Sequence, residues 1–187
     1  DPPRWEPHLS VSELSSFLEM VKEQGGYIEE EPLSAAPYGT MAEIAGPSGT
    51  RLCLWSADDF GGHSPQPKTG VPRWYELQLI EDGPERDFWP SILNWTKTSE
   101  DGGKPQYQAA DGTSVARIQI IEADNGIVLN VPRWITFIQV DDVGAICADA
   151  AAIDATILAK PYDVENVGRC AIISDPQGTV FGVIQIP

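Results

Sequence analysis

The sequence predicts an α+β fold built from repeated βαβββ modules, and three observations support this. The tripeptide Pro-Arg-Trp occurs three times, beginning at Pro3, Pro72 and Pro132. Residues 1–56 and 130–187 can be overlaid from their tryptophans without a gap, and both copies place a proline 27 residues after the tryptophan. The later segments YGTMAEIAGPSGTRLCLW and VGRCAIISDPQGTVFGVI then share Gly, Ala, Ile, Pro, Gly and Thr in register. We therefore interpret Pro-Arg-Trp as the head of a repeated unit of about 55 residues.

Each module is expected to open with a strand. WYELQLI at residues 74–80 and WITFIQV at residues 134–140 are rich in aromatic and β-branched residues, which is typical of strands. The corresponding stretch WEPHLSV at residues 5–11 contains Pro7. Because proline cannot donate to a strand ladder, we expect this first strand to be weak or to lie at an edge.

A helix is expected after each of these strands. Apolar residues recur at helical spacing in residues 10–26, where Ser10 and Glu13 form a possible capping box. The helix in residues 83–95 is expected to be shortened or kinked by Pro90. The third helix follows Asp141 or Asp142, either of which can cap it.

Two or three further strands complete each module. The sequences GPSGT and DPQGT supply the Pro and Gly that a tight reversal between strands needs. Residues 57–70 are predicted to be a linker between modules, and residues 97–106 a polar loop.

The composition excludes several classes of partner. The chain has 12 Lys and Arg against 28 Asp and Glu, a formal net charge of −16, which repels nucleic acid and anionic lipid. No apolar stretch reaches the ~20 residues of a membrane span. Three cysteines lie far apart, so we expect reduced thiols and a cytoplasmic location.

Several phrases resemble the vicinal oxygen chelate superfamily, which includes glyoxalase I, bleomycin-resistance proteins and extradiol dioxygenases. The most specific is GR-x-A-x-x-x-DPQG at Gly168–Gly178, continued by FG at residues 181–182. ADGTSVARI at residues 110–118 is similar to the family phrase dGxPVAGI, and Phe88-Trp89 with residues 93–95 looks like a variant of FYxxLFGW. The closest match is to the bacterial two-domain glyoxalase-like branch.

The resemblance implies that modules pair into a curved mixed sheet that encloses a cavity. Residues 71–187 would then form a complete domain of two modules, 71–122 and 131–187. Residues 1–56 would form a single half-module, whose mate is either missing from this sequence or supplied by another chain. Because an uncovered half leaves strand edges exposed, we expect a homodimer.

The same resemblance bears on metal binding. Metal-dependent members carry a glutamate about four residues after the glycine of the DPxG turn; here those places hold Cys53 and Gly182. The heads of the first strands carry tryptophan, and the two histidines, His8 and His63, are expected at the surface or an interface. We therefore expect no metal, with a divalent metal as the alternative.

The candidate site lies on the strands that open the second and third modules. Alternation places Trp74, Glu76 and Gln78 on one face of their strand, and we expect that face to line the cavity that the resemblance implies. The third module is expected to add Trp134, Thr136 and Ile138. Glu76 could be a ligand anchor or general base with a raised pKa, or a structural residue paired with Arg73 or Arg133.

Three hypotheses about function follow. The first is a metal-free protein that binds a small organic molecule, aromatic or cationic, in a tryptophan-lined cavity. The second is a lyase or dioxygenase of the same superfamily that uses Glu76 as a metal ligand or general base. The third is an assembly module without a ligand.

Overall fold

The structure, a computed structural model, describes residues 3–62, 68–101, 104–121 and 132–187. Three helices lie in these ranges: α1 (Leu14–Glu23), α2 (Glu85–Ile92) and α3 (Val143–Ala152). The strands, in chain order, are β1 (His8–Ser10), β2 (Tyr27–Ser34), β3 (Gly39–Ala45), β4 (Arg51–Ala57), β5 (Pro72–Leu79), β6 (Thr96–Asp101), β7 (Lys104–Gln108), β8 (Ser114–Ile120), β9 (Arg133–Gln139), β10 (Thr156–Val164), β11 (Gly168–Ser174) and β12 (Val180–Gln185).

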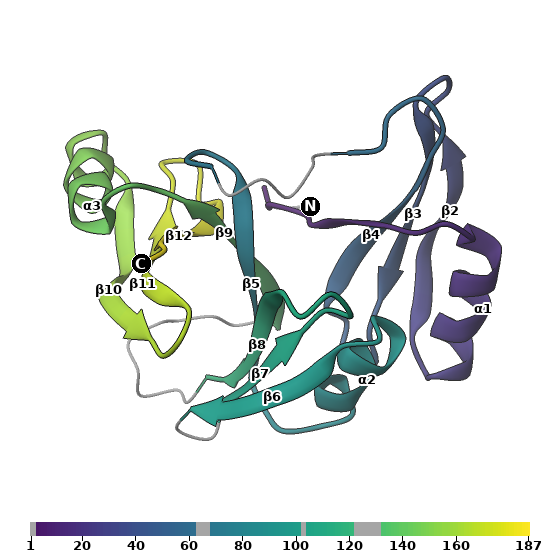
Figure 1. The fold of residues 1–187 in the computed structure, drawn as a ribbon. Helices are drawn as coiled ribbons and strands as arrows, with labels where there is room; N and C mark the ends of the chain where they lie inside the picture. Colours follow the sequence, from purple (N-terminus) through teal and green to yellow (C-terminus); the bar gives the residue numbers. More distant parts are fainter. Residues whose placement is uncertain (1–2, 63–67, 102–103, 122–131) are drawn as a thin grey trace.

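The strands form two mixed sheets, which confirms the predicted α+β class (Figure 1). One sheet has four strands in the order β1-β4-β3-β2, and the other has eight in the order β10-β11-β12-β9-β5-β8-β7-β6. The twelve strands of the described residues fall into three consecutive sets of four, β1–β4, β5–β8 and β9–β12. In each set the first and fourth strands are parallel neighbours. The eight-stranded sheet is therefore two such sets joined where β5 and β9 pair antiparallel.

Helices α1 and α2 share one apolar core with strands of both sheets, whereas α3 packs on β10–β12 at the opposite end of the molecule from α1 (Figure 1). Their shared core combines Val21 of α1 and Trp89 of α2 with Leu54 of the smaller sheet and Leu77 of the larger one. Burial of this apolar surface is the main force that holds the first module against the second.

Glu85 adds a polar connection across this interface. It is 1% exposed and accepts a hydrogen bond from the Ser48 backbone N–H at 2.5 Å, in the turn between β3 and β4. Trp89 Nε1–H donates to both Glu85 and Thr50, at 2.8 Å in each case. Burial raises the pKa of Glu85 above its ordinary value.

Three local predictions can be compared with the structure. Asp142 caps α3 by accepting a hydrogen bond from the Ala145 N–H at 2.9 Å, as predicted. The capping box at Ser10 and Glu13 is wrong, because Glu13 is the N-cap of α1 and its side chain makes no capping hydrogen bond. The polar loop at residues 97–106 is also wrong, because β6 and β7 pair there as an antiparallel hairpin stabilised by pairing with β8.

Among the described residues, no helix is long and apolar enough to cross a membrane.

Candidate functional site

Trp74, Glu76 and Gln78 lie on one face of β5, the inner face of the eight-stranded sheet. Their partners across the ladder to β9 include Phe137, which is opposite Trp74 and belongs to the same apolar cluster. All three side chains are buried, and Trp74 and Glu76 are each only 1% exposed. The alternation expected from the sequence is therefore the one that β5 adopts.

Glu76 forms a buried ion pair with Arg117 of β8, its neighbour across the parallel ladder. Arg117 Nε and Nη2 both lie 2.5 Å from Glu76 Oε2, and Gln78 Nε2 donates to Oε1 at 2.6 Å. Both carboxylate oxygens are thus occupied. The sequence suggested Arg73 or Arg133 as structural partners, but the observed partner is Arg117.

Two further ionisable groups surround the pair. Arg117 lies over the ring of Tyr162 at 5.5 Å from its centre, and its Nη2 donates to the Tyr162 hydroxyl at 3.3 Å. Burial raises the pKa of Tyr162 far above its ordinary value and that of Cys170 to about 12. Both groups are therefore neutral at pH 7, so the Glu76 carboxylate and the Arg117 guanidinium are the charges of this cluster.

The predicted cavity-facing position of Trp134 is wrong. Trp134 pairs across the ladder with Leu77 and packs on the helix side, where its ring makes edge contacts with Trp89 and Trp95 at 5.5 and 6.1 Å between centres. The cause is a shift in register between Pro72 and Trp74. A bulge moves one strand by one residue and so reverses which face its side chains take.

Thr136 and Ile138 share the orientation of Trp134. Thr136 is opposite Tyr75, which packs against the helix-side core, and Ile138 is opposite Val183, which packs with α3. The structure therefore separates the six candidate residues into two sets of three on opposite faces. Only the β5 set lies on the inner face.

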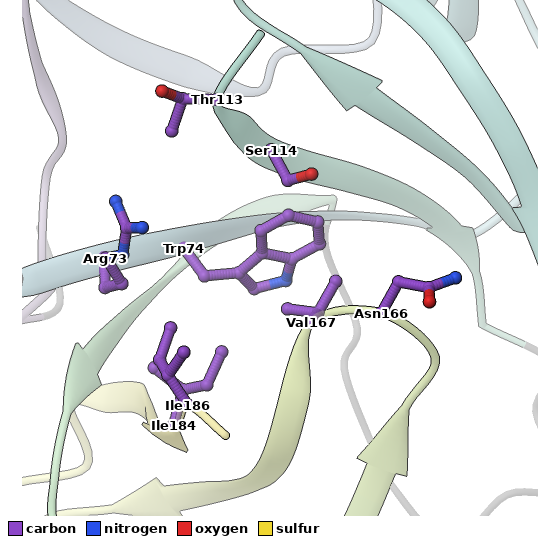
Figure 2. A pocket seen from close by; sticks show the side chains of 8 residues that line it. All are labelled: Arg73, Trp74, Thr113, Ser114, Asn166, Val167, Ile184 and Ile186. Carbon is purple, nitrogen blue, oxygen red and sulfur yellow. The ribbon is translucent and has the colours of Figure 1, made fainter.

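A pocket of about 270 Å³ opens beside Trp74, which lies between Ser114 on one side and Ile184 and Ile186 on the other (Figure 2). The nitrogen edge of the indole is turned toward Val167. The full lining is Arg73, Trp74, Thr113, Ser114, Asn166, Val167, Ile184 and Ile186. Trp74 Nε1 is buried and has no hydrogen-bond partner in the described part of the chain.

The residues at the family's metal positions do not fit a metal centre. A side chain at Gly182 would collide with the ring of Phe137, so a glutamate has no room there. Burial, together with Glu6 and Glu43, raises the pKa of Cys53 to about 11, which disfavours the thiolate that binds metals. Across residues 3–62, 68–101, 104–121 and 132–187, no three His, Cys, Asp or Glu side chains gather as ligands.

His8 does not join the candidate site. His8 is exposed on β1, opposite Cys53, and His63 lies outside the described residues. Arg117 and Tyr162 were not identified from the sequence. Arg117 could have been found, because it belongs to the phrase ADGTSVARI. That phrase forms β8, which pairs parallel with β5 and places Arg117 opposite Glu76.

Comparison with known proteins supports the fold. No protein-family model matches the chain. CFP32 of Mycobacterium bovis, provisionally named a glyoxylase, is 27% identical over 190 residues, which cover 98% of this chain and 70% of that protein. The anthracycline biosynthesis protein DnrV of Streptomyces peucetius is 27% identical over 192 residues, covering 99% of this chain and 66% of DnrV.

Solved structures share the fold. The Mn(II)-bound glyoxalase from Novosphingobium aromaticivorans superposes with a TM-score of 0.64 at 15% identity, covering 95% of this chain and 61% of that one. The 2,2',3-trihydroxybiphenyl 1,2-dioxygenase of Sphingomonas wittichii gives a TM-score of 0.64 at 10% identity, covering 98% and 71%. The resemblance to the vicinal oxygen chelate superfamily is confirmed, and the chain has its fold. It spans about two thirds of the length of these relatives.

Proposed function

We propose that this protein binds a small organic molecule in the pocket beside Trp74, without a metal. The observation that carries the proposal is Trp74, whose side chain lines the pocket and whose buried indole N–H lacks a partner among the described residues. A buried donor left without an acceptor costs about 1–3 kcal/mol. A ligand that supplies the acceptor recovers that free energy.

The lining favours an aromatic ligand with an acceptor oxygen. Val167, Ile184 and Ile186 offer apolar contact, while Ser114 and Asn166 add polar groups. Arg73 also lines the pocket, so a cationic ligand, the other class expected from the sequence, is disfavoured. The pocket is near the lower end of known ligand sites, which suits a compound of one or two rings. Two relatives are named for glyoxylase and for anthracycline biosynthesis, and both names concern small organic molecules.

The alternative is a lyase or dioxygenase in which Glu76 is a metal ligand or general base. The names of the relatives and of the structural neighbours, one of them a Mn(II)-bound glyoxalase, support it. Such a role requires Glu76 to exchange its contacts with Arg117 and Gln78 for the metal or substrate. A rise in metal affinity, or in lyase or dioxygenase activity, when the contact between Glu76 and Arg117 is broken would favour this alternative.

The indole N–H signals in a ¹H–¹⁵N spectrum test the proposal directly. The chain has six tryptophans, and Trp74→Phe identifies the Trp74 signal by its loss. Acetophenone, an aromatic ketone, is expected to shift that signal with a Kd of about 1 mM. Phenylalanine keeps an aromatic ring but lacks the donor, so Trp74→Phe is expected to weaken binding by about 2–12-fold. Binding to this variant is followed through the backbone amide signals of Ser114 and Val167, which also line the pocket.

Trp55→Phe is the matched control, because Trp55 donates to the Phe60 carbonyl at 2.8 Å on β4, outside the pocket. This variant is expected to bind acetophenone as the wild type does. Equal affinity of the wild type and Trp74→Phe would refute the proposed contact.

We also propose that residues 71–187 act as one two-module unit and residues 1–56 as a single module, with residues 57–70 as the linker. The repeated strand order supports this division. The homodimer expected from the sequence remains a prediction. Light scattering of the purified protein measures it as a doubling of the 20.3 kDa chain mass.

A further inference from the structure

A second and larger pocket, of about 490 Å³, lies where the first and third Pro-Arg-Trp segments meet. The N-terminal segment and the turn before β4 form one side of it, and the starts of β9 and β12 form the other. Its lining is Pro3, Arg4, Trp5, Glu6, Gly49, Arg51, Pro132, Arg133, Trp134, Gly178 and Val180. It shares no lining residue with the pocket beside Trp74.

Two buried donors in this lining have no partner in the described parts of the chain: Arg133 Nε and Trp134 Nε1. Trp134 is 6% exposed. Arg133 is opposite Gln78 in the ladder between β5 and β9, yet the Gln78 side-chain oxygen is also without a partner among the described residues. Arg133 and Trp134 are the first two residues of β9, so their side chains point to opposite faces of the sheet, and both residues line the pocket at the strand end.

The other two arginines of the pocket already have carboxylate partners within the chain. Arg4 contacts Glu6 at 3.4 Å and Glu43 at 2.9 Å, and Arg51 contacts Glu43 at 3.4 Å. Burial lowers the pKa of Arg133 below its ordinary value, because the guanidinium has lost water without gaining a carboxylate. This imbalance points to an anion supplied from outside the chain.

We propose that this second pocket binds a small aromatic carboxylate. The carboxylate accepts hydrogen bonds from the Arg133 guanidinium, and the aromatic ring lies against Trp5. The Trp5 ring is 48% exposed and is held in place by a tilted contact with Phe181, at 6.3 Å between centres. A flat exposed indole beside a guanidinium is suited to an anion attached to a ring.

The negative net charge of the protein favours a ligand with a single negative charge over one with two. The chain carries a net charge of −16, so a dianion is repelled more strongly than a monoanion on its approach. We therefore expect a singly charged carboxylate to bind better than a phosphate ester of similar shape. The volume lies within the range of small-molecule sites.

Isothermal titration with sodium benzoate tests this proposal, with benzamide as the neutral analogue and phenyl phosphate as the dianion. Benzoate is expected to bind with a Kd in the millimolar range, at least about 10-fold more tightly than benzamide, and to weaken as NaCl rises. Arg133→Gln is expected to weaken benzoate binding by at least about 10-fold. Arg169→Gln, which removes an exposed arginine paired with Asp163, is the matched control and is expected to change nothing.

Trp5→Ala provides a second variant that does not depend on the buried arginine, since its ring is half exposed. It is expected to weaken benzoate binding by about 2–10-fold while leaving the melting temperature unchanged. Equal binding of benzoate and benzamide would overturn the proposal, as would full affinity in both variants. Loss of benzoate binding in Trp74→Phe with retention in Arg133→Gln would also overturn it, because benzoate would then occupy the other pocket.

Discussion

Arg117→Met tests whether Glu76 is held as a structural residue. Glu76 and Arg117 are 1% and 4% exposed and lie 2.5 Å apart. Removing one partner of a buried ion pair leaves the other charge desolvated and costs about 3–5 kcal/mol. In a chain of 187 residues, about 2–4 °C is lost per kcal/mol. We therefore expect the melting temperature to fall by about 6–20 °C.

Urea unfolding followed by circular dichroism measures the loss as a change in the free energy of unfolding. The double variant Glu76→Leu with Arg117→Met removes both charges together, and we expect it to be more stable than Arg117→Met alone. Arg169→Met is the matched control, because its pair with Asp163 at 3.1 Å is exposed. Breaking that pair is expected to cost about 0–1 kcal/mol.

The result that would refute this reasoning is a loss below about 1 kcal/mol in Arg117→Met, equal to that of the exposed control. Glu76 would then have access to water or to a ligand without Arg117. The general-base reading of Glu76 would become the stronger one.

Three further outcomes are expected. Gly182→Glu should lower the free energy of unfolding by at least about 1–3 kcal/mol, because the ring of Phe137 fills the space that the new side chain needs; a variant as stable as the wild type would contradict this packing. Glu85→Gln should lower the free energy of unfolding by about 1–3 kcal/mol, since both carboxylate oxygens accept hydrogen bonds. Burial raises the pKa of Glu85 in the folded state, so protonation of Glu85 stabilises the fold most below the ordinary pKa of the carboxyl group. The difference in free energy of unfolding between the wild type and Glu85→Gln should therefore narrow as pH rises through the folded-state pKa, and a widening difference would contradict this. Of the three cysteines, only the partly exposed Cys147 should react with a thiol reagent at pH 8 before denaturation; early reaction of all three would contradict the burial of the other two.

The sequence predicts the framework of the fold because its signals are local or repeated. Pro-Arg-Trp marks the start of β5 and β9, and alternation along β5 places Trp74, Glu76 and Gln78 together. The DPQG turn lies between β11 and β12, as expected from its Pro and Gly.

Other features depend on contacts between distant strands and cannot be read locally. The register shift beside Arg73 gives Trp74 and Trp134 opposite orientations, although their local sequences are alike. The hairpin of β6 and β7 is polar and forms through pairing with β8, which local composition does not reveal. Arg117 reaches Glu76 over a separation of 41 residues.

Native mass spectrometry of the freshly purified protein tests the central proposal, metal-free binding of a small organic molecule, most directly. It reports the mass of the chain, any bound metal and any retained small molecule in one spectrum. We expect a metal-free chain that retains an aromatic compound or binds an added one, with weaker binding in Trp74→Phe. One divalent ion per chain, bound stoichiometrically, would contradict it and make the metal-dependent lyase or dioxygenase the leading function.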